Sequence, residues 1–354
     1  MNVVNYVLST LCVMLVSLPL FAKTLSSEQR DQFTAIYAPE LGNIYACPQN
    51  TSSEYGFCAN SLKNPQNAPQ ILMPKDGPQA VLVLQHGLSD SPYFMHYVGQ
   101  QLQRRGYIVI LPLTPGHGKK DANADMKDDN LQQRWYQHTE QVMNFAYGFD
   151  LPVFIGGFST GGALAVQYAL LNQDKISGVM LFSGALALSG AAESLANIWG
   201  IKHLAKWIDG EYETMGPHPH KYPSVAGFSA LVLMDVIRDI RGLLEDATST
   251  NTPIYMPLFV AHSMADIVTP FKGVDMLVNA VEGEHVVFKI DESYDLCHAD
   301  LPMSQIQLIG LRFQKSEVNQ SERCAIPEPN PLHNQMMLML NNYLDLQLQN
   351  KKNQ

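Results

Sequence analysis

The chain is poor in charge, and basic residues are its scarcer charged type. Only 16% of its 354 residues are Asp, Glu, Lys or Arg, and 33 acidic against 23 basic side chains give a formal net charge of −10 at pH 7. The lysines and arginines are scattered, so the basic stripe that nucleic-acid binding requires is missing and nucleic acid is not an expected partner. Internal repeats and low-complexity tracts are also absent, so a repeat architecture is not indicated.

Charge is missing altogether from residues 1–22, which contain an apolar run from 7 to 21 broken by Pro19. This pattern resembles a secretory signal peptide cleaved after Ala22, although no Lys or Arg precedes the apolar core. An uncleaved membrane anchor at the N-terminus is the alternative, because the run is just long enough to span a bilayer. Cys12 lacks the small neighbours of a lipidation site. We therefore expect an exported protein, periplasmic or secreted.

Cysteine is rare as well. Cleavage after residue 22 would leave four cysteines, an even number that favours disulfide bonds in an oxidising compartment. Four cysteines allow three pairings, and proximity in sequence favours Cys47 with Cys58 and Cys297 with Cys324. The second bridge would tie the loop around residue 298 to an insertion at 301–331. Four separate buried thiols are the alternative.

Residues 157–161 read Gly-Phe-Ser-Thr-Gly and are the most informative pattern in the chain. An apolar run at 151–155 precedes them and a helix-forming stretch at 163–171 follows, which predicts strand, tight turn and helix. A serine at such a turn is held in a strained backbone conformation with its hydroxyl above the sheet edge. Ser159 is therefore a candidate nucleophile, and the alternative is an ordinary glycine-rich loop.

Attack on a carbonyl also needs donors for the oxyanion. A buried strand predicted at 80–85 runs into a loop of small residues at 86–92. We expect the backbone N–H groups of Leu88 and Thr160 to point at the same place and to hold the developing oxyanion.

A base and a group that orients it are needed as well. Asp266 follows a predicted strand at 257–262, and His298 follows another at 285–290. Both lie past the carboxyl ends of their strands, where the ligand sites of open α/β sheets collect. His298 is the expected base and Asp266 the expected acid, and the order serine, aspartate, histidine is that of α/β-hydrolases.

Together these motifs resemble an α/β-hydrolase of the branch that contains bacterial carboxylesterases, monoacylglycerol lipases and serine-aminopeptidase-type hydrolases. The resemblance covers about residues 70–348. Besides the serine motif, the shared pieces are His86-Gly87, the tract 105–112 that leads to Gly116-His117-Gly118, and the Asp266 turn. It implies an α/β fold with a mostly parallel central sheet flanked by helices and an inserted helical lid.

The sequence departs from this family pattern in two places. His262-Ser263 stands where relatives usually have His-Gly before the acid. In addition, some 30 residues separate His298 from the last predicted helix, where the family often has far fewer. Within this stretch, residues 305–311 are interpreted as an extra strand.

Other residues compete for each role. His86 and His117 fall at the same sheet edge and are expected to shape the oxyanion loop and pocket. Asp266 competes with four further carboxylates that can equally be solvated or cap helices: Asp275, Asp291, Asp295 and Asp300. His218 and His220 suggest a metal, but they lie in a proline-broken loop without acidic or thiolate partners, so no metal site is expected.

About 330 residues would remain after cleavage, enough for one large α/β domain. We divide the chain into a signal peptide at 1–22, an N-terminal extension at 23–70 and an α/β-hydrolase domain at 71–350. The stretch at about 185–254 is longer than a simple crossover needs and is interpreted as the lid insertion. Leu233, Val236 and their neighbours at helical spacing equally suit a helix packed on the sheet. Ile198, Trp199, Ile201, Leu204 and Trp207 better suit a lid with an apolar underside.

These observations predict an exported serine hydrolase that cleaves carboxylic esters, with acyl or lipid-like groups, through an acyl-enzyme. No cofactor is implied. The expected partner is a small ester or lipid substrate, with transient membrane contact through the lid. An acyltransferase or an aminopeptidase with the same three residues is the alternative, as is a catalytically silent binding protein, which would be expected to have lost one of them.

Overall fold

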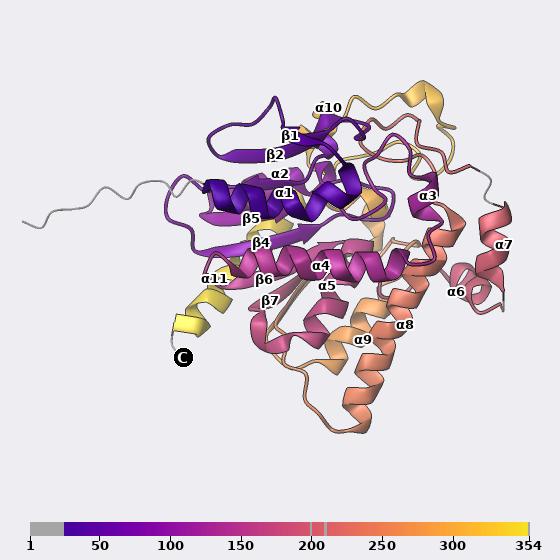
Figure 1. The fold of residues 1–354 in the computed structure, drawn as a ribbon. Helices are drawn as coiled ribbons and strands as arrows, with labels where there is room; N and C mark the ends of the chain where they lie inside the picture. Colours follow the sequence, from indigo (N-terminus) through magenta and orange to yellow (C-terminus); the bar gives the residue numbers. More distant parts are fainter. Residues whose placement is uncertain (1–24, 199, 209–210, 353–354) are drawn as a thin grey trace, which may run out of the picture.

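The computed structural model describes residues 25–198, 200–208 and 211–352. Its centre is a nine-stranded sheet in the order β1-β2-β3-β5-β4-β6-β7-β8-β9, flanked by helices on both faces (Figure 1). The strands from β4 to β9 pair in parallel, whereas β1, β2 and β3 are antiparallel. This is the mostly parallel α/β sheet that the sequence predicts. The signal peptide predicted at 1–22 lies outside the described residues.

The six parallel strands follow the apolar runs of the sequence closely. They are β4 (Ala80–Gln85), β5 (Tyr107–Leu111), β6 (Val153–Phe158), β7 (Gly178–Phe182), β8 (Leu258–Ser263) and β9 (His285–Ile290). The first five are buried along their whole length, as expected for strands covered on both faces. Their carboxyl ends meet at one edge of the sheet, and there the loops with the candidate residues begin.

Alternate residues of each strand point to different faces and build two hydrophobic cores. Val81 and Val83 of β4 belong to the larger core, and Leu82 and Leu84 belong to the other. The larger core is covered by α1 (Ser27–Leu41), α4 (Leu131–Tyr147), α5 (Thr160–Leu171), α8 (Gly227–Ser249) and α9 (Lys272–Ala280). The second core is covered by α2 (Tyr93–Arg104) and α11 (His333–Lys352). A short helix, α3 (Asn123–Met126), precedes α4.

The N-terminal extension adds strands to the sheet. β1 (Ile44–Ala46) and β2 (Glu54–Ala59) form a hairpin, and β3 (Gln70–Leu72) joins them to β5. A disulfide between Cys47 and Cys58 closes the hairpin. The buried side chains of Phe33 and Tyr37 pack α1 into the larger core.

The long insertion between β7 and β8 divides into two parts. Helix α8 belongs to the core, since its buried face packs against α5 and α4, and this agrees with the helix that its spacing predicts. Before it come α6 (Gly190–Ala196) and α7 (Ile201–Ile208), which lie at the edge of the molecule (Figure 1). No described side chain of α7 is buried. The part of 185–254 that stands off the sheet is therefore much shorter than the whole insertion.

The extra strand predicted at 305–311 is wrong, because this segment forms helix α10 (Gln305–Gly310). The Ser304 side chain caps the helix by accepting a hydrogen bond from the backbone N–H of Gln307. The Gln307 side chain is buried and donates to the carbonyls of Tyr93 and Phe94, while Ile306 and Ile309 are 63% and 74% exposed. The polar residue faces inward here, so hydrophobic alternation misleads.

Among residues 25–198, 200–208 and 211–352, no helix combines the length and apolar character needed to cross a membrane.

Candidate active site

Ser159 occupies the sharp turn between β6 and α5. Its backbone has a φ of 54° and a ψ of −117°, a conformation that residues other than glycine rarely adopt. A Cβ at Gly157 would lie 2.5 Å from the Gln85 carbonyl oxygen, and one at Gly161 would lie 2.4 Å from the same atom. The two glycines are therefore required for the turn to approach β4, which explains the Gly-x-Ser-x-Gly pattern.

Ser159, His298 and Asp266 form one hydrogen-bonded chain. The Nε2 atom of His298 lies 2.9 Å from the Oγ of Ser159, and its Nδ1 atom lies 2.6 Å from the Oδ2 of Asp266. His298 begins the short 3-10 helix η4 (His298–Asp300) after β9, and Asp266 lies in the turn after β8. Three loops at the carboxyl edge of the sheet thus bring together residues up to 139 positions apart in sequence.

The Asp266 carboxylate is buried and accepts several hydrogen bonds. Its Oδ1 accepts the backbone N–H groups of Val268 and Thr269 at 2.9 and 3.0 Å, and its Oδ2 accepts the Thr269 hydroxyl at 2.9 Å. Burial alone would raise the pKa of Asp266, but the charge and hydrogen bond of His298, the Thr269 N–H and the charge of His262 lower that pKa to about 2. The carboxylate therefore stays ionised at every pH at which the protein would work.

Thr269 is a site residue that the sequence analysis missed. Its hydroxyl lies 3.2 Å from the Nδ1 of His298 as well as 2.9 Å from Asp266. The available signal was the Asp-x-x-Thr spacing, in which an aspartate accepts the N–H groups two and three residues later. This turn fixes which way the carboxylate faces.

The departure at His262-Ser263 also has a structural role. The Oγ of Ser263 donates to the Leu296 carbonyl at 2.7 Å, which joins the end of β8 to the loop before His298. The buried His262 ring contacts the Thr269 carbonyl through Nε2 at 2.9 Å. Through these buried contacts, both residues help to fix the position of the turn that contains Asp266.

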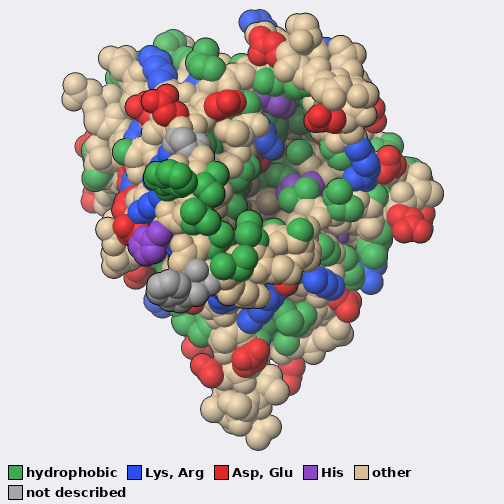
Figure 2. Space-filling model, turned by 90° about the vertical axis from the view of Figure 1, so that its right-hand side faces the viewer, with side chains coloured by type: hydrophobic (Ala, Val, Ile, Leu, Met, Phe, Trp, Pro, Cys, Tyr) green, Lys and Arg blue, Asp and Glu red, His purple; other side chains and the backbone are tan. Residues whose placement is uncertain are grey.

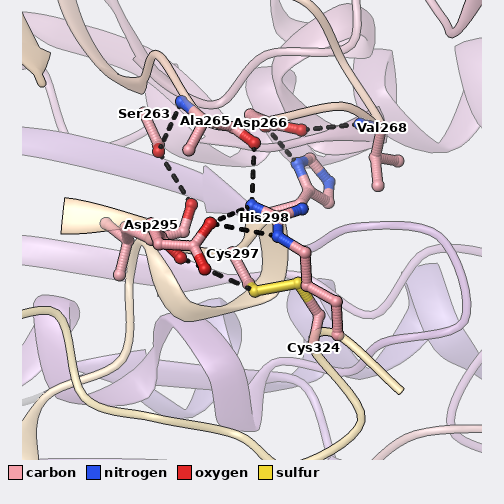
Figure 3. The surroundings of a disulfide bond; sticks show 10 residues. Ser263, Ala265, Asp266, Val268, Asp295, Cys297, His298 and Cys324 are labelled. Carbon is pink, nitrogen blue, oxygen red and sulfur yellow. Dashed lines mark hydrogen bonds and ion pairs between the residues drawn. A yellow bond between two sulfur atoms is a disulfide. The ribbon is translucent and has the colours of Figure 1, made fainter. Parts of the chain in front are cut away.

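A disulfide joins Cys297, the residue before His298, to Cys324 in the insertion at 301–331 that precedes α11 (Figure 3). The neighbouring Arg323 donates to the Oδ1 of Asp295 at 2.7 Å and to the Ala265 carbonyl at 3.1 Å. Residues 323 and 324 therefore contact the loops of both His298 and Asp266. Both pairings favoured by the sequence, Cys47 with Cys58 and Cys297 with Cys324, are present in the structure.

The loop after β4 lies beside the nucleophile turn. Within the described part of the chain, the backbone N–H groups of Leu88 and Thr160 have no hydrogen-bond partner, as expected of oxyanion donors. Ser89 has a φ of 61°, and its carbonyl accepts the backbone N–H of Tyr222 at 2.8 Å. The loop is thus held in a strained conformation by a residue of the insertion.

The rival histidines lie in packed surroundings. Burial lowers the pKa of His86 to about 4 and that of His117 to about 3, and their rings pack edge to face against each other. The Nε2 of His86 accepts the Thr114 N–H at 3.1 Å. His220 stacks on Tyr93 with ring centroids 3.7 Å apart. In the described ranges, no group of three or more His, Cys, Asp or Glu is placed to hold a metal ion.

The rival carboxylates are not at the His298 ring. Asp275 is exposed on α9, Asp291 caps a turn by accepting the Ser293 N–H, and Asp295 pairs with Arg323. Asp300 is buried beside Glu328. Among the candidates, only Asp266 contacts the Nδ1 of His298.

One face of the molecule is hollowed. Figure 2 shows this hollow with histidine side chains inside it and hydrophobic side chains along its sides. Ser159 itself is only 7% exposed, and the His298 side chain is 13% exposed. The reacting atoms are therefore largely shielded from solvent, and hydrogen bonds to a developing charge are stronger in such surroundings than in water.

Comparison with known proteins places this geometry in a family. Residues 76–295 match the family described as serine aminopeptidase, S33, a range that includes Ser159 and Asp266 and ends just before His298. A thermostable monoacylglycerol lipase of Bacillus sp. (strain H-257) is 22% identical over 240 residues, 68% of this chain and 91% of the relative.

Solved structures of similar fold include a metagenome-derived lipolytic enzyme from a study of LipS and LipT. It has a TM-score of 0.52 at 20% identity and covers 66% of this chain and 91% of its own. A monoglyceride lipase from Saccharomyces cerevisiae has a TM-score of 0.51 at 13% identity over 79% and 92% of the two chains. The chain is thus a serine hydrolase of the esterase and lipase type. It belongs to the serine aminopeptidase S33 family and has the α/β-hydrolase fold.

Proposed function

We propose that the protein is an exported hydrolase that cleaves carboxylic esters with lipid-like acyl groups through Ser159, His298 and Asp266. One observation carries this proposal. The hydrogen-bonded chain from the Ser159 Oγ through the His298 ring to the Asp266 carboxylate has the distances that nucleophile, base and orienting acid require.

In the proposed reaction, the Ser159 Oγ attacks the ester carbonyl while the His298 Nε2 accepts the hydroxyl proton. The N–H groups of Leu88 and Thr160 hold the oxyanion of the tetrahedral intermediate. The C–O bond to the alcohol then breaks, and the alcohol leaves with the proton from Nε2, so that Ser159 is acylated. Water repeats the sequence with His298 as base and releases the carboxylic acid and free Ser159.

Asp266 has a defined part in both steps. Because it is ionised and accepts a hydrogen bond from Nδ1, it keeps the proton on that nitrogen and leaves Nε2 free to act as base. It also stabilises the imidazolium that forms in each transition state. Thr269 orients the carboxylate for this task.

The apolar side chains of α7 support a lipid-like acyl group. Leu204, Trp207 and Ile208 share one face of the helix and are 47%, 81% and 64% exposed. We propose that α6 and α7 act as the lid over the site and that this face meets acyl chains or a membrane surface. The similarity to a monoacylglycerol lipase supports the same substrate class.

An aminopeptidase of this family would need a carboxylate to hold the substrate amine. Asp90 is the acidic residue of the oxyanion loop, but it is buried and lies 3.2 Å from the Nζ of Lys221. Its charge is already neutralised, so this observation favours a neutral ester over a peptide with a free N-terminus.

Export is proposed from the apolar character of residues 1–22 and from the two disulfides. Bridges of this kind persist in the periplasm or outside the cell, where thiols are not kept reduced. Thiol alkylation of the fractionated protein, followed by mass spectrometry, tests both points. Reduced cysteines in cytoplasmic material, with residues 1–22 retained, would contradict them.

The catalytic proposal is tested by labelling and by hydrolysis. A fluorophosphonate should modify the wild type on Ser159, and p-nitrophenyl esters of increasing chain length should be hydrolysed. Ser159→Ala should abolish both, whereas Ser177→Ala, a matched change at a buried serine that precedes β7, should leave both intact. Labelling on another serine, or full activity of Ser159→Ala, would refute the assignment. Absence of hydrolysis by a labelled protein would indicate a transferase.

A further inference from the structure

A large groove in the protein is lined by four segments that are distant in sequence. Its volume is about 1190 Å³, which is ample for a lipid headgroup. These segments are the loop after β2, the loop after β5, the insertion loop before α8, and the end of α10 with the residues that follow it. We name the groove the cation groove, after three of its lining residues: Lys63, Lys120 and Arg312.

The cation groove is basic in a protein that is acidic overall. None of its lining residues is Asp or Glu, although the chain carries ten more acidic than basic side chains. Lys63 is fixed in place because its Nζ donates to the carbonyls of His218 and Lys221 at 3.1 and 2.9 Å. Lys120 donates to the Asn60 carbonyl at 2.8 Å. The Arg312 guanidinium has no partner in the described part of the chain, so it is available to an anion.

Exposed apolar side chains border the same groove. Met215 and Ile309 line it and are 76% and 74% exposed, and Ile306 lies one turn from Ile309 on the same face of α10. Burial of Gln307 on the opposite side holds this face outward. Bulky apolar residues held outward beside cations are typical of interaction surfaces.

We propose that the cation groove docks the protein on a bilayer, with the anionic phosphate headgroup of a phospholipid between Lys120 and Arg312. The side chains of Ile306, Ile309 and Met215 then enter the acyl boundary of the bilayer. A small soluble anion would contact the cations but leave the isoleucines exposed to water, and a neutral ester would contact only the isoleucines. An anionic lipid surface would contact both the cations and the isoleucines. None of the lining residues belongs to α7, and the proposal does not depend on the catalytic proposal.

Sedimentation with vesicles tests the proposal without an activity readout. The mature chain should bind vesicles of phosphatidylcholine with phosphatidylglycerol and leave vesicles of phosphatidylcholine alone unbound. Lys120→Gln with Arg312→Gln should lower the partition coefficient about 25-fold, since each cation near an anionic surface typically contributes about fivefold. High salt should weaken wild-type binding in the same direction. Ile306→Ser with Ile309→Ser should also release the protein.

Matched controls carry the same chemical changes elsewhere. Lys75→Gln with Lys175→Gln removes two exposed cations that precede β4 and β7, at the opposite edge of the sheet, and should leave binding unchanged. Leu171→Ser with Leu338→Ser replaces apolar residues that are 58% and 60% exposed and should also be neutral. Thermal melting verifies that each variant is folded.

Three results would overturn the proposal. One is binding to anionic vesicles that survives both groove variants. Another is binding that Leu204→Ser with Trp207→Ser loses while each groove variant keeps it, which would assign the membrane contact to α7 and not to the groove. The third is equal binding of soluble glycerol 3-phosphate by the wild type and the isoleucine variant, measured by calorimetry, with no binding of vesicles. That result would make the groove a site for small anions.

Discussion

Asp266 stays charged in a buried place because two N–H groups, a hydroxyl and the His298 ring point at it. Asp266→Asn preserves the size of the side chain, but its amide can donate to the Nδ1 of His298. The proton would then sit on Nε2, so that this nitrogen could no longer accept the Ser159 proton. We expect kcat to fall by roughly 10^4, as in serine proteases, with little change in melting temperature. Steady-state kinetics on a short p-nitrophenyl ester measures this. Asp295→Asn is the matched control, and an inactive control beside an active Asp266→Asn would identify a different acid.

Asp300 has the opposite ionisation behaviour. Burial raises its pKa to about 7, and the nearby charge of Glu328 contributes to the rise, although a Glu328 hydrogen bond and the charge of Lys221 act against it. Between about pH 4 and pH 7 the Asp300 carboxyl therefore binds more protons in the folded than in the unfolded state, so its contribution to the free energy of unfolding should fall as pH rises through this window.

Asp300→Asn should remove this part of the pH dependence. Urea unfolding at several pH values should give a variant that gains stability relative to the wild type at pH 8 and gains little at pH 4. Asp174→Asn, at an exposed carboxylate, is the control and should follow the wild type. The same pH dependence of stability in Asp300→Asn and the wild type would contradict the assignment.

Sequence could identify Ser159 because a glycine motif records the backbone requirement directly. It could not identify Thr269 or Ser263, whose roles depend on side-chain contacts with residues brought close only by folding. Leu88 and Thr160 could be named, because oxyanion donors are backbone groups whose positions follow from the strand ends. Their free N–H groups agree with that role but leave it a prediction.

At the scale of elements, the Cys297–Cys324 bridge and Arg323 hold the His298 loop from one side. The bridge closes a sequence separation of 27 residues, for which chain entropy gives about 3 to 4 kcal/mol. Cys297→Ser with Cys324→Ser should therefore lower the melting temperature. The variant should also lose kcat more than KM, because a mobile imidazole fails mainly in the transition state.

The Cys47→Ser, Cys58→Ser variant provides the matched control for this effect. It removes a bridge remote in sequence from His298, so it should lose stability and keep kcat. Equal kcat in both double variants would mean that the His298 loop keeps its position without the second bridge.

Helix α7 is held by charges more than by burial. Lys202 pairs with Asp235, and Lys206 lies 2.6 Å from Asp129. If its outer face meets acyl chains, Leu204→Ser with Trp207→Ser should lower kcat/KM for long-chain esters several-fold and leave short-chain esters unchanged. Leu171→Ser with Leu338→Ser is the control. An equal loss for all chain lengths would indicate a fold defect and not a substrate contact.

The strands of the sheet were easier to predict than the segments that connect them. The buried strands β4 to β8 are continuous apolar runs, so composition alone locates them. The segment of α10 has the same apolar character, but a serine cap and the buried Gln307 decide its conformation. These are local hydrogen bonds and a tertiary contact, which alternation of residue type does not record.

At the scale of the whole molecule, the N-terminal extension is part of the sheet and not a separate appendage. β3 connects the β1–β2 hairpin to β5, and α1 packs into the larger core. The sequence predicted an N-terminal extension at 23–70 but not its strands, because three-residue strands such as β1 and β3 are too short to show periodicity. The sheet order likewise depends on pairings between distant strands.

Among the residues that the structure describes, each of the two disulfides joins cysteines that follow one another along the chain. During the export that we propose, the cysteines would leave the membrane in sequence order. An oxidant that joins them in that order would form the native pairs directly, without rearrangement. Biogenesis should then require a thiol oxidase but no disulfide isomerase, provided that Cys12 is kept away from Cys47. A signal peptide at 1–22 that stays in the membrane until it is cleaved would keep Cys12 away from Cys47. Yield in strains lacking either enzyme would measure the difference.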